Sequence, residues 1–284
     1  MAIHNYLFCD WCNWNGCLYY SQNHKGEKMS KEVIKKEENA MFAVEMDETA
    51  LAMMNEDSET YVDETSAEDI SIPRIKILQS GSKQVKKADP LYIKGAEEGD
   101  VFNTLSEEVV PGDEGIFFVP VKRRHSYVEW RDVDSGGGIV QNFGEDSTAY
   151  NKIVADDRGR RRTSEETGII KNYETFGYVV KADGSFEEVL LSMSNTQVKK
   201  MKRFNALIRS LTSRTTGKML PEYAGCYKIS TVPESNDKNS WFNYHIEFAG
   251  LTMTVKNGVM IYEKAKGFAE MVKNSEVKVN YDQE

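Results

Sequence analysis

The chain has few of the features that mark secreted or membrane proteins. It contains 4 cysteines, and only Cys226 lies beyond the first 17 residues, so no disulfide framework is expected in the body of the chain. No apolar stretch approaches the roughly 20 residues that a membrane-spanning helix needs. The N-terminus also lacks the apolar run of a secretory signal. These absences indicate an intracellular protein without a membrane partner.

Recognisable catalytic motifs are absent as well. The sequence has no Gly-x4-Gly-Lys-Ser/Thr loop, no Gly-x-Gly-x2-Gly and no Gly-x-Ser-x-Gly elbow. Only His125 and His245 lie in the body, too few for a histidine-based metal site or triad. Asp100, Glu108 and Glu129 could be arranged as a nuclease carboxylate set, but the lysine required two residues after Glu129 is missing. We therefore expect a binding protein that is not an enzyme and uses no cofactor.

The first 28 residues have two competing interpretations. Cys9, Cys12 and Cys17 resemble half of a zinc knuckle, but no fourth ligand lies at finger spacing. The residues directly before Met29 can be written in codons as a purine-rich ribosome-binding sequence followed by a start codon. We therefore predict that Met29 is the natural initiator and that residues 1–28 are a translated leader or a disordered extension, without a metal.

Acidic charge is concentrated in one segment. The chain has a formal net charge of −9, yet residues 32–69 alone hold 13 acids against two lysines, so the remainder is near neutral. This composition favours a disordered acidic arm at residues 29–69. The apolar clusters at 41–44 and 51–54 leave a transient amphipathic helix as the alternative.

From residue 70 onwards the pattern is that of short strands and turns. Pro120 within a buried run indicates a bulge or an edge, and Asp183-Gly184 indicates a hairpin turn. The expected strands cover residues 74–77, 115–121, 127–130, 176–180, 187–193, 227–232 and 241–248, and the expected helices cover residues 196–212 and 260–272. Residues 70–272 are thus predicted to form a mainly β domain with inserted helices (α+β), an OB-type barrel with elaborations, followed by a tail at 273–284.

Basic residues gather in four segments of this body. Residues 189–221 contain seven bases and no acid, and a helix at 196–212 would place them away from its apolar stripe. Solvated helix faces usually mix both signs of charge, so this run favours phosphate binding. A further cluster lies at residues 158–162. The candidate phosphate-binding residues are Arg74, Lys76, Lys83, Lys86, Lys87, Lys122, Arg123, Arg124, Lys199, Lys200, Lys202, Arg203 and Arg209.

Aromatic side chains distinguish a single strand from a duplex as the partner. Unpaired bases stack on aromatic rings, at about 1–3 kcal/mol per base. Apolar residues alternate with others along the expected strand 241–248. They form one face of the strand, so Trp241 and His245 lie on the other face. Strand 127–130 offers one aromatic on each face. Core packing is the usual fate of such rings, but Tyr127, Trp241 and His245 are the candidates for contact with bases.

Several stretches resemble single-stranded DNA-binding proteins of tailed bacteriophages. They are Ile-Pro-Arg-Ile-Lys-Ile-Leu-Gln at 72–79, Gly-Asp-Val-Phe-Asn-Thr at 99–104, Tyr-Val-Glu-Trp-Arg at 127–131 and Ser-x-Thr-Gln-x-Lys-Lys at 194–200. The resemblance covers roughly residues 70–270. It implies an OB-type barrel that coats replicating DNA in the cytoplasm of an infected bacterium. Such proteins commonly end in an acidic tail that recruits replication proteins, whereas here the acid lies in the N-terminal arm.

Together these features favour a protein that binds and protects single-stranded DNA during phage replication or recombination. A phage virion or other structural protein without nucleic-acid activity is the alternative, and a recombination or annealing protein is a third reading. The acidic arm is expected to contact replication proteins and to cover the phosphate-binding surface when DNA is absent. Deleting residues 1–69 should therefore tighten DNA binding at low salt and change it little at high salt.

Overall fold

The computed structural model describes residues 48–60, 72–157 and 159–274. The chain divides into two compact units, residues 1–64 and 65–284. In the first unit, part of the acidic arm forms helix α2 (Glu48–Thr60), which is the helical alternative of the sequence prediction. The predictions for residues 1–28 and for the end of the tail lie outside the described residues. None of the described helices is long and apolar enough to cross a membrane.

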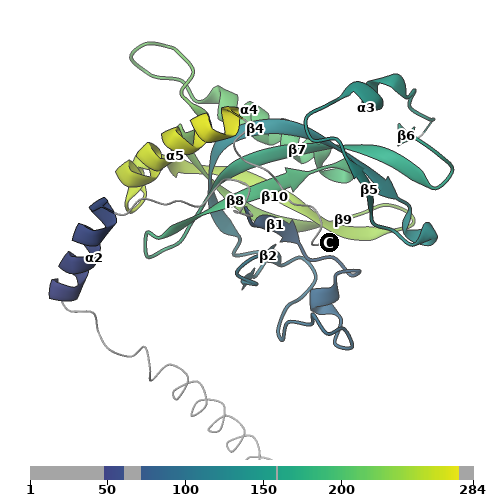
Figure 1. Ribbon diagram of the computed structural model, residues 1–284, viewed down its shortest axis with the longest axis horizontal. Coiled ribbons are helices and arrows are strands. Elements are labelled where there is room, and N and C mark those ends of the chain that lie inside the picture. Colours follow the sequence, from purple (N-terminus) through teal and green to yellow (C-terminus); the bar gives the residue numbers. More distant parts are fainter. Residues whose placement is uncertain (1–47, 61–71, 158, 275–284) are drawn as a thin grey trace, which may run out of the picture. The chain divides into compact units, whose positions relative to one another are not determined.

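The second unit is mainly β, as predicted. Its described strands form one curled, open sheet, a half-barrel, in the order β10-β9-β4-β7-β8-β1-β2-β3, with β5 beside β4 and β6 beside β7 (Figure 1). The strands are β1 (Arg74–Ile77), β2 (Val101–Asn103), β3 (Val109–Val110), β4 (Ile116–Arg131), β5 (Ile139–Asn142), β6 (Arg161–Arg162), β7 (Thr167–Val180), β8 (Phe186–Met193), β9 (Gly225–Ser235) and β10 (Ser240–Leu251).

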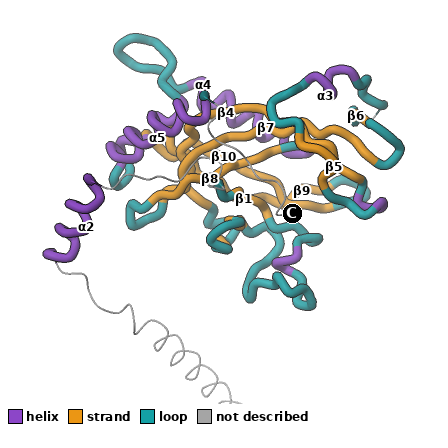
Figure 2. Tube along the Cα trace, viewed as in Figure 1, coloured by secondary structure: helices purple, strands orange, loops and turns teal. Residues whose placement is uncertain are grey.

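Helices and short 3-10 turns lie between these strands and after the last of them (Figure 2). The α-helices of this unit are α3 (Thr148–Lys152), α4 (Val198–Ser210) and α5 (Gly258–Lys273). The 3-10 turns are η1 (Lys83–Val85), η2 (Val133–Ser135), η3 (Asn195–Gln197), η4 (Glu222–Ala224) and η5 (Thr252–Thr254).

The two longer helices cover opposite faces of the sheet. Neighbouring strand residues point to opposite faces. Accordingly Phe118 packs in one core with Phe204 and Ile208 of α4, whereas Val119 packs in another with Phe268 of α5. Each helix therefore presents an apolar stripe to the sheet and leaves its remaining side chains for solvent.

The curl of the sheet brings β1 towards β10, although no strand pairing joins them. The side chain of Gln79 donates to the Phe242 carbonyl (2.8 Å) and accepts from the Phe242 amide (2.9 Å). The Tyr244 hydroxyl donates to the Ile75 carbonyl at 3.3 Å. At Gly99 (φ +95°) a Cβ atom would lie 2.6 Å from the Phe242 ring, so this approach requires glycine.

Most predicted elements are confirmed, and the differences have local causes. The predicted strands at 115–121 and 127–130 are one strand, β4, because the register shifts at Pro120 and pairing with β7 continues beyond it. The hairpin at Asp183-Gly184 joins β7 to β8, with Gly184 at φ +91°. The basic segment at 158–162, which lies outside the predicted strands, includes β6, which pairs with β7.

Candidate nucleic-acid interface

Helix α4 is fixed at its start and along its apolar side. The Ser194 amide donates to the Gln197 side chain at 3.3 Å, which closes the turn before the helix. Met201, Phe204 and Ile208 are almost fully buried in the core, as the sequence periodicity predicts. The apolar stripe thus determines which basic residues face outwards.

The outward face of α4 is positively charged. Lys199, Lys202, Arg203 and Arg209 are exposed, and no described carboxylate forms a salt bridge with them. Arg203 lies close enough to Glu247 to help lower the pKa of that carboxyl, after the larger effect of His245. Four neighbouring cations on one helix attract phosphate groups.

Lys200 is different, because it fastens the helix to the sheet. Its Nζ atom lies 2.7 Å from Glu234 Oε1 on β9, and Asn243 Nδ2 of β10 donates to Glu234 Oε2 at 2.7 Å. The Lys200 ammonium, followed by the Asn243 amide, lowers the pKa of Glu234. Lys200 therefore has a structural partner in this state.

A second contact joins α4 to the basic run of β4. Arg123 donates from Nε and Nη2 to the two carboxylate oxygens of Glu222 (3.0 and 2.9 Å) and from Nη1 to Asn205 Oδ1 (2.6 Å). Lys202 and Arg209 lie three residues before and four residues after Asn205, so they share its side of the helix. Two basic segments that are far apart in the sequence thus meet at one place.

Next to the contact between Arg123 and Asn205, a row of aromatic and basic side chains lies along β4 and β7. The register pairs Arg123 with Thr175, His125 with Tyr173 and Tyr127 with Lys171, which places these side chains on one face. The His125 and Tyr173 rings are 4.8 Å apart, and Lys171 Nζ lies 5.1 Å from the Tyr173 centroid.

A cleft of about 240 Å³ lies between this face and α4. Its lining includes His125, Tyr173 and Asn205, together with the ion pairs of Arg123 with Glu222 and of Arg124 with Glu174. The positive charge of this region therefore comes from Lys171 and from the cations of α4 at its rim. Burial, and then the nearby Lys171 charge, lower the pKa of His125, so the neutral imidazole is favoured. We name the surface of this cleft and its helix rim the basic strip; its members are His125, Lys171, Tyr173, Lys202 and Arg209, and the ion pair of Arg123 with Glu222 lies beneath it as a structural contact.

The other predicted contact residues are distributed over the domain. Arg124 is held by the buried carboxylate of Glu174 (2.7 Å) and lies over the Phe176 ring. Tyr127 is buried, with its ring 5.0 Å from Tyr150. Arg74 is buried and Lys76 half-buried on β1, Lys122 is half-buried, Lys83, Lys86 and Lys87 are exposed on or beside η1, and Trp241 and His245 are half-buried on β10.

The basic cluster at 158–162 is engaged within the protein. Arg160 and Arg162 form ion pairs with Asp156 (2.9 Å) and Asp132 (2.5 Å). Arg161 donates to the Tyr150 carbonyl and lies 4.4 Å from the centroid of the Tyr150 ring. In this part of the described chain the arginines hold a β-hairpin together, which leaves them less available to phosphate.

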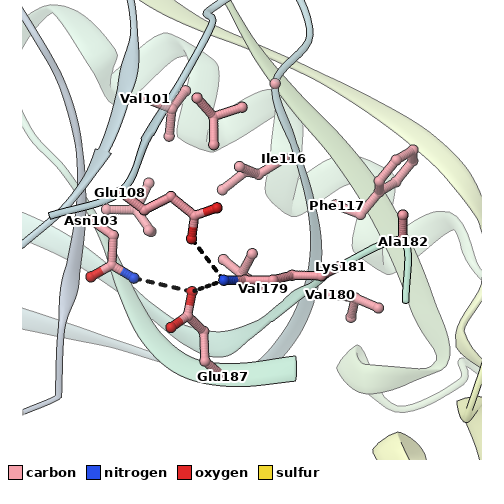
Figure 3. A pocket seen from close by; sticks show the side chains of 13 residues that line it. Val101, Asn103, Glu108, Ile116, Phe117, Val179, Val180, Lys181, Ala182 and Glu187 are labelled. Carbon is pink, nitrogen blue, oxygen red and sulfur yellow. Dashed lines mark hydrogen bonds and ion pairs between the residues drawn. The ribbon is translucent and has the colours of Figure 1, made fainter. Parts of the chain in front are cut away.

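A hollow of about 170 Å³ between β2, β4, β7 and β8 has another character (Figure 3). Lys181 Nζ lies 2.7 Å from Glu108 Oε2 and 3.9 Å from Glu187 Oε1, and Asn103 donates to Glu187 at 3.2 Å. The bond from Glu108 raises the pKa of Lys181. Two carboxylates against one ammonium make this hollow unfavourable for phosphate.

Sequence reasoning missed Lys171 and Tyr173, which lie at the centre of the strip. The predicted strand began at residue 176, whereas β7 begins at Thr167. Alternation over 169–175 was the available signal, since it puts Lys171, Tyr173 and Thr175 on one face. The side-chain contact between Asn205 and Arg123 had no local signal.

The comparisons with known proteins give the chain a family. A family model described as Pam3 phage gp34-like protein matches residues 36–278, well over half of the chain. Comparison with curated proteins and with solved structures found no match. The predicted phage origin is confirmed by the first finding. The chain belongs to the Pam3 phage gp34-like protein family.

Proposed function

We propose that this protein binds single-stranded DNA along the basic strip and the outward face of α4. One observation carries the proposal, namely the contact between Arg123 and Asn205. It places Lys202 and Arg209, which form no salt bridge with a described residue, beside a strand face that carries the exposed His125 ring and the half-buried Tyr173 ring. Phosphate groups require cations, and unpaired bases require ring faces, and this surface offers both.

The rings favour a single strand over a duplex. Bases stacked within a duplex do not present their faces, whereas a single strand can lay them on aromatic side chains. The Tyr173 ring is half-buried, with Lys171 near its face and His125 at its edge. The base and the phosphate of a single nucleotide could therefore be bound at this place.

The wider proposal includes an OB-type role for the half-barrel. The mainly antiparallel sheet curls around a buried core, and part of one face is left for a ligand, as in OB-fold proteins. We further propose that the protein acts in the cytoplasm of the infected host during replication or recombination, and that the acidic arm contacts replication proteins.

A matched pair of triple variants tests the proposal. In the first, Lys171, Lys202 and Arg209 of the strip become alanine. In the second, Lys264, Lys266 and Lys273 of α5 become alanine; these are exposed and belong to the helix on the opposite face of the sheet. Both variants lose three positive charges, so a general charge effect would change them equally.

We expect the strip variant alone to lose affinity for labelled oligo-dT. Each phosphate contact contributes roughly 0.7 to the slope of log K against log salt for single strands, so the slope should become shallower by about 2. Equal losses in both variants would contradict the placement of the site. A wild-type protein that binds no oligonucleotide at low salt would favour the structural-protein alternative.

A further inference from the structure

One polar side chain in the cleft between α4 and the β4–β7 face is buried without a hydrogen-bond partner. Thr175 of β7 is 0% exposed, and its Oγ1 atom forms no hydrogen bond within the described part of the chain. A hydroxyl can donate one hydrogen bond and accept two. Buried polar groups almost always use this capacity, because leaving it unused is costly. The Thr175 hydroxyl therefore points to a partner outside the described chain.

The Thr175 side chain faces α4 across the cleft. Thr175 is paired with Arg123 on β4, and directly paired residues point to the same side of a sheet. On that side the Arg123 side chain reaches Asn205 of α4. All three residues line the cleft of about 240 Å³, together with the buried Met201 of α4. Since the hydroxyl is covered from bulk solvent, its partner must be a group that enters the cleft.

The charges inside the cleft balance one another. Among the described residues that line it, Arg123 is paired with Glu222 at 2.9 Å. Arg124 is paired in the same way with Glu174, at 2.7 Å. Burial lowers the pKa of His125, which favours its neutral form. The interior of the cleft therefore favours an uncharged group, whereas the cations of α4 at its rim favour an anion.

These properties match a nucleobase better than a phosphate or an apolar group. A base is uncharged and planar, and its edge presents hydrogen-bond donors and acceptors side by side. The His125 and Tyr173 rings offer planar surfaces in the lining. The volume is below the range of about 300–1,000 Å³ that is typical of pockets for whole small molecules. The cleft thus suits one base whose sugar and phosphate stay outside.

We propose that one unpaired base enters this cleft and that the Thr175 hydroxyl forms a hydrogen bond with its edge. The inference rests on the proposed function and deepens it, because it adds a base preference to a surface that otherwise recognises phosphates and ring faces. The base lies in the neutral interior, and its phosphate lies at the rim beside Lys202 and Arg209. A base without a matching edge group leaves the buried hydroxyl unpaired and is therefore bound less tightly.

Free deoxynucleosides test this proposal without any phosphate. Deoxyadenosine, deoxycytidine, deoxyguanosine and thymidine are titrated separately into the full-length protein, and saturation-transfer NMR records contact between the base protons and the protein. We expect saturable binding with at least one base preferred. The affinity should be the same at low and high salt, because these ligands are uncharged. Absence of saturable binding for all four nucleosides would overturn the proposal.

A matched pair of variants locates the site. Thr175→Val removes the hydroxyl and keeps the shape of the side chain, so it should weaken the preferred nucleoside by about three- to tenfold and make the four more equal. Thr252→Val is the control. Thr252 is also 0% exposed and its hydroxyl has no partner among the described residues, but it belongs to η5 and does not line the cleft. Its variant should bind the nucleosides as the wild type does.

The stability of Thr175→Val separates recognition from folding. Because the hydroxyl has no partner in the described chain, the melting temperature without ligand should equal or exceed that of the wild type. If the new methyl group prevents folding, Thr175→Ala removes the hydroxyl without adding bulk and replaces this variant. Unchanged nucleoside affinity in a folded variant without the hydroxyl, or an equal loss in Thr252→Val, would overturn the assignment of the base to this cleft.

Nucleosides and oligonucleotides together distinguish this proposal from the function on which it rests. Oligo-dT binding should weaken steeply as salt rises, whereas nucleoside binding should not. Saturable nucleoside binding by a protein that binds no oligonucleotide would support the base site and contradict the DNA-binding function. Oligonucleotide binding by a protein that binds none of the nucleosides would support the function and contradict the base site.

Discussion

Two basic segments of this protein are similar in sequence and different in structure. In α4, Lys199, Lys202 and Arg209 are exposed without a salt bridge to any described residue. In the 158–162 segment, Arg160 and Arg162 are paired with aspartates. The difference arises because α4 follows a stretch without acids, whereas carboxylates of the neighbouring turns fold back on the second segment. A cluster of bases therefore indicates a binding surface only when its counter-ions lie elsewhere.

Arg124 is the extreme case of an engaged base, and its loss should have the largest effect. The Glu174 side chain is fully buried, and the Arg124 side chain is 14% exposed. Arg124→Ala would leave a buried carboxylate that, among the described residues, is held by Ser126 alone, so we expect a loss of about 3–5 kcal/mol in urea unfolding. Lys122→Ala, a neighbouring base without an ion pair in the described chain, should change stability by under about 0.5 kcal/mol. Similar losses of stability in the two variants would contradict the distinction between paired and unpaired bases.

Changing Arg160, Arg161 and Arg162 to Ala should separate stability from binding. The variant loses three charges, as the strip variant does, but it also loses the contacts that hold β6 and its turn. We expect it to unfold more easily, by on the order of 1 kcal/mol, and to bind oligo-dT within about twofold of the wild type. Weakening equal to that of the strip variant, measured by fluorescence anisotropy, would show that the segment also binds phosphate.

The tyrosines of the two regions should behave in opposite ways. Tyr173→Ala removes a half-buried ring beside His125 and Lys171 and should cost about 1–3 kcal/mol of oligonucleotide affinity, whereas Tyr173→Phe should retain it. Tyr150 is covered by Tyr127 and Arg161, so Tyr150→Ala should reduce stability and leave affinity unchanged. Equal affinity losses in the Tyr150 and Tyr173 alanine variants would show that Tyr173 contributes no more to DNA binding than Tyr150 does.

The smallest expected effect is a pH dependence at His125. Its pKa is lowered from 6.5 in the folded protein, mainly by burial, so the unfolded chain binds the proton more tightly. Stability from this group is complete above pH 6.5 and is lost as the pH falls through the folded pKa. His125→Gln should flatten the melting temperature between pH 7 and pH 5. If the melting temperature of the variant depends on pH as in the wild type, another group is responsible for the titration.

The local part of this architecture was predictable from sequence. The alternation of apolar and polar residues predicted most strands, and Asp183-Gly184 predicted a hairpin. The apolar stripe through Met201, Phe204 and Ile208 predicted α4 and its buried side. These features depend on neighbours in the chain. The exposed bases of α4 followed directly from that stripe.

The rest depends on contacts between distant residues. The pairing of Arg124 with Glu174 spans 50 residues, and the contact of Arg123 with Asn205 spans 82. Because of the first contact, the predicted phosphate ligand Arg124 forms an internal ion pair. The second contact brings β4 and α4 together at the basic strip. The burial of Tyr127 and the partial exposure of Tyr173 likewise follow from the long pairing of β4 with β7. The sequence pattern placed the start of β7 too late.

The most direct measurement of the central claim is the affinity of the full-length protein for labelled oligo-dT across a salt series. A phosphate-binding surface of exposed cations predicts tight binding at low salt without added metal or nucleotide. It also predicts a linear fall of log K with log salt, with a slope of several units if about six phosphates are contacted. Absence of binding at low salt, or an affinity independent of salt, would contradict the account.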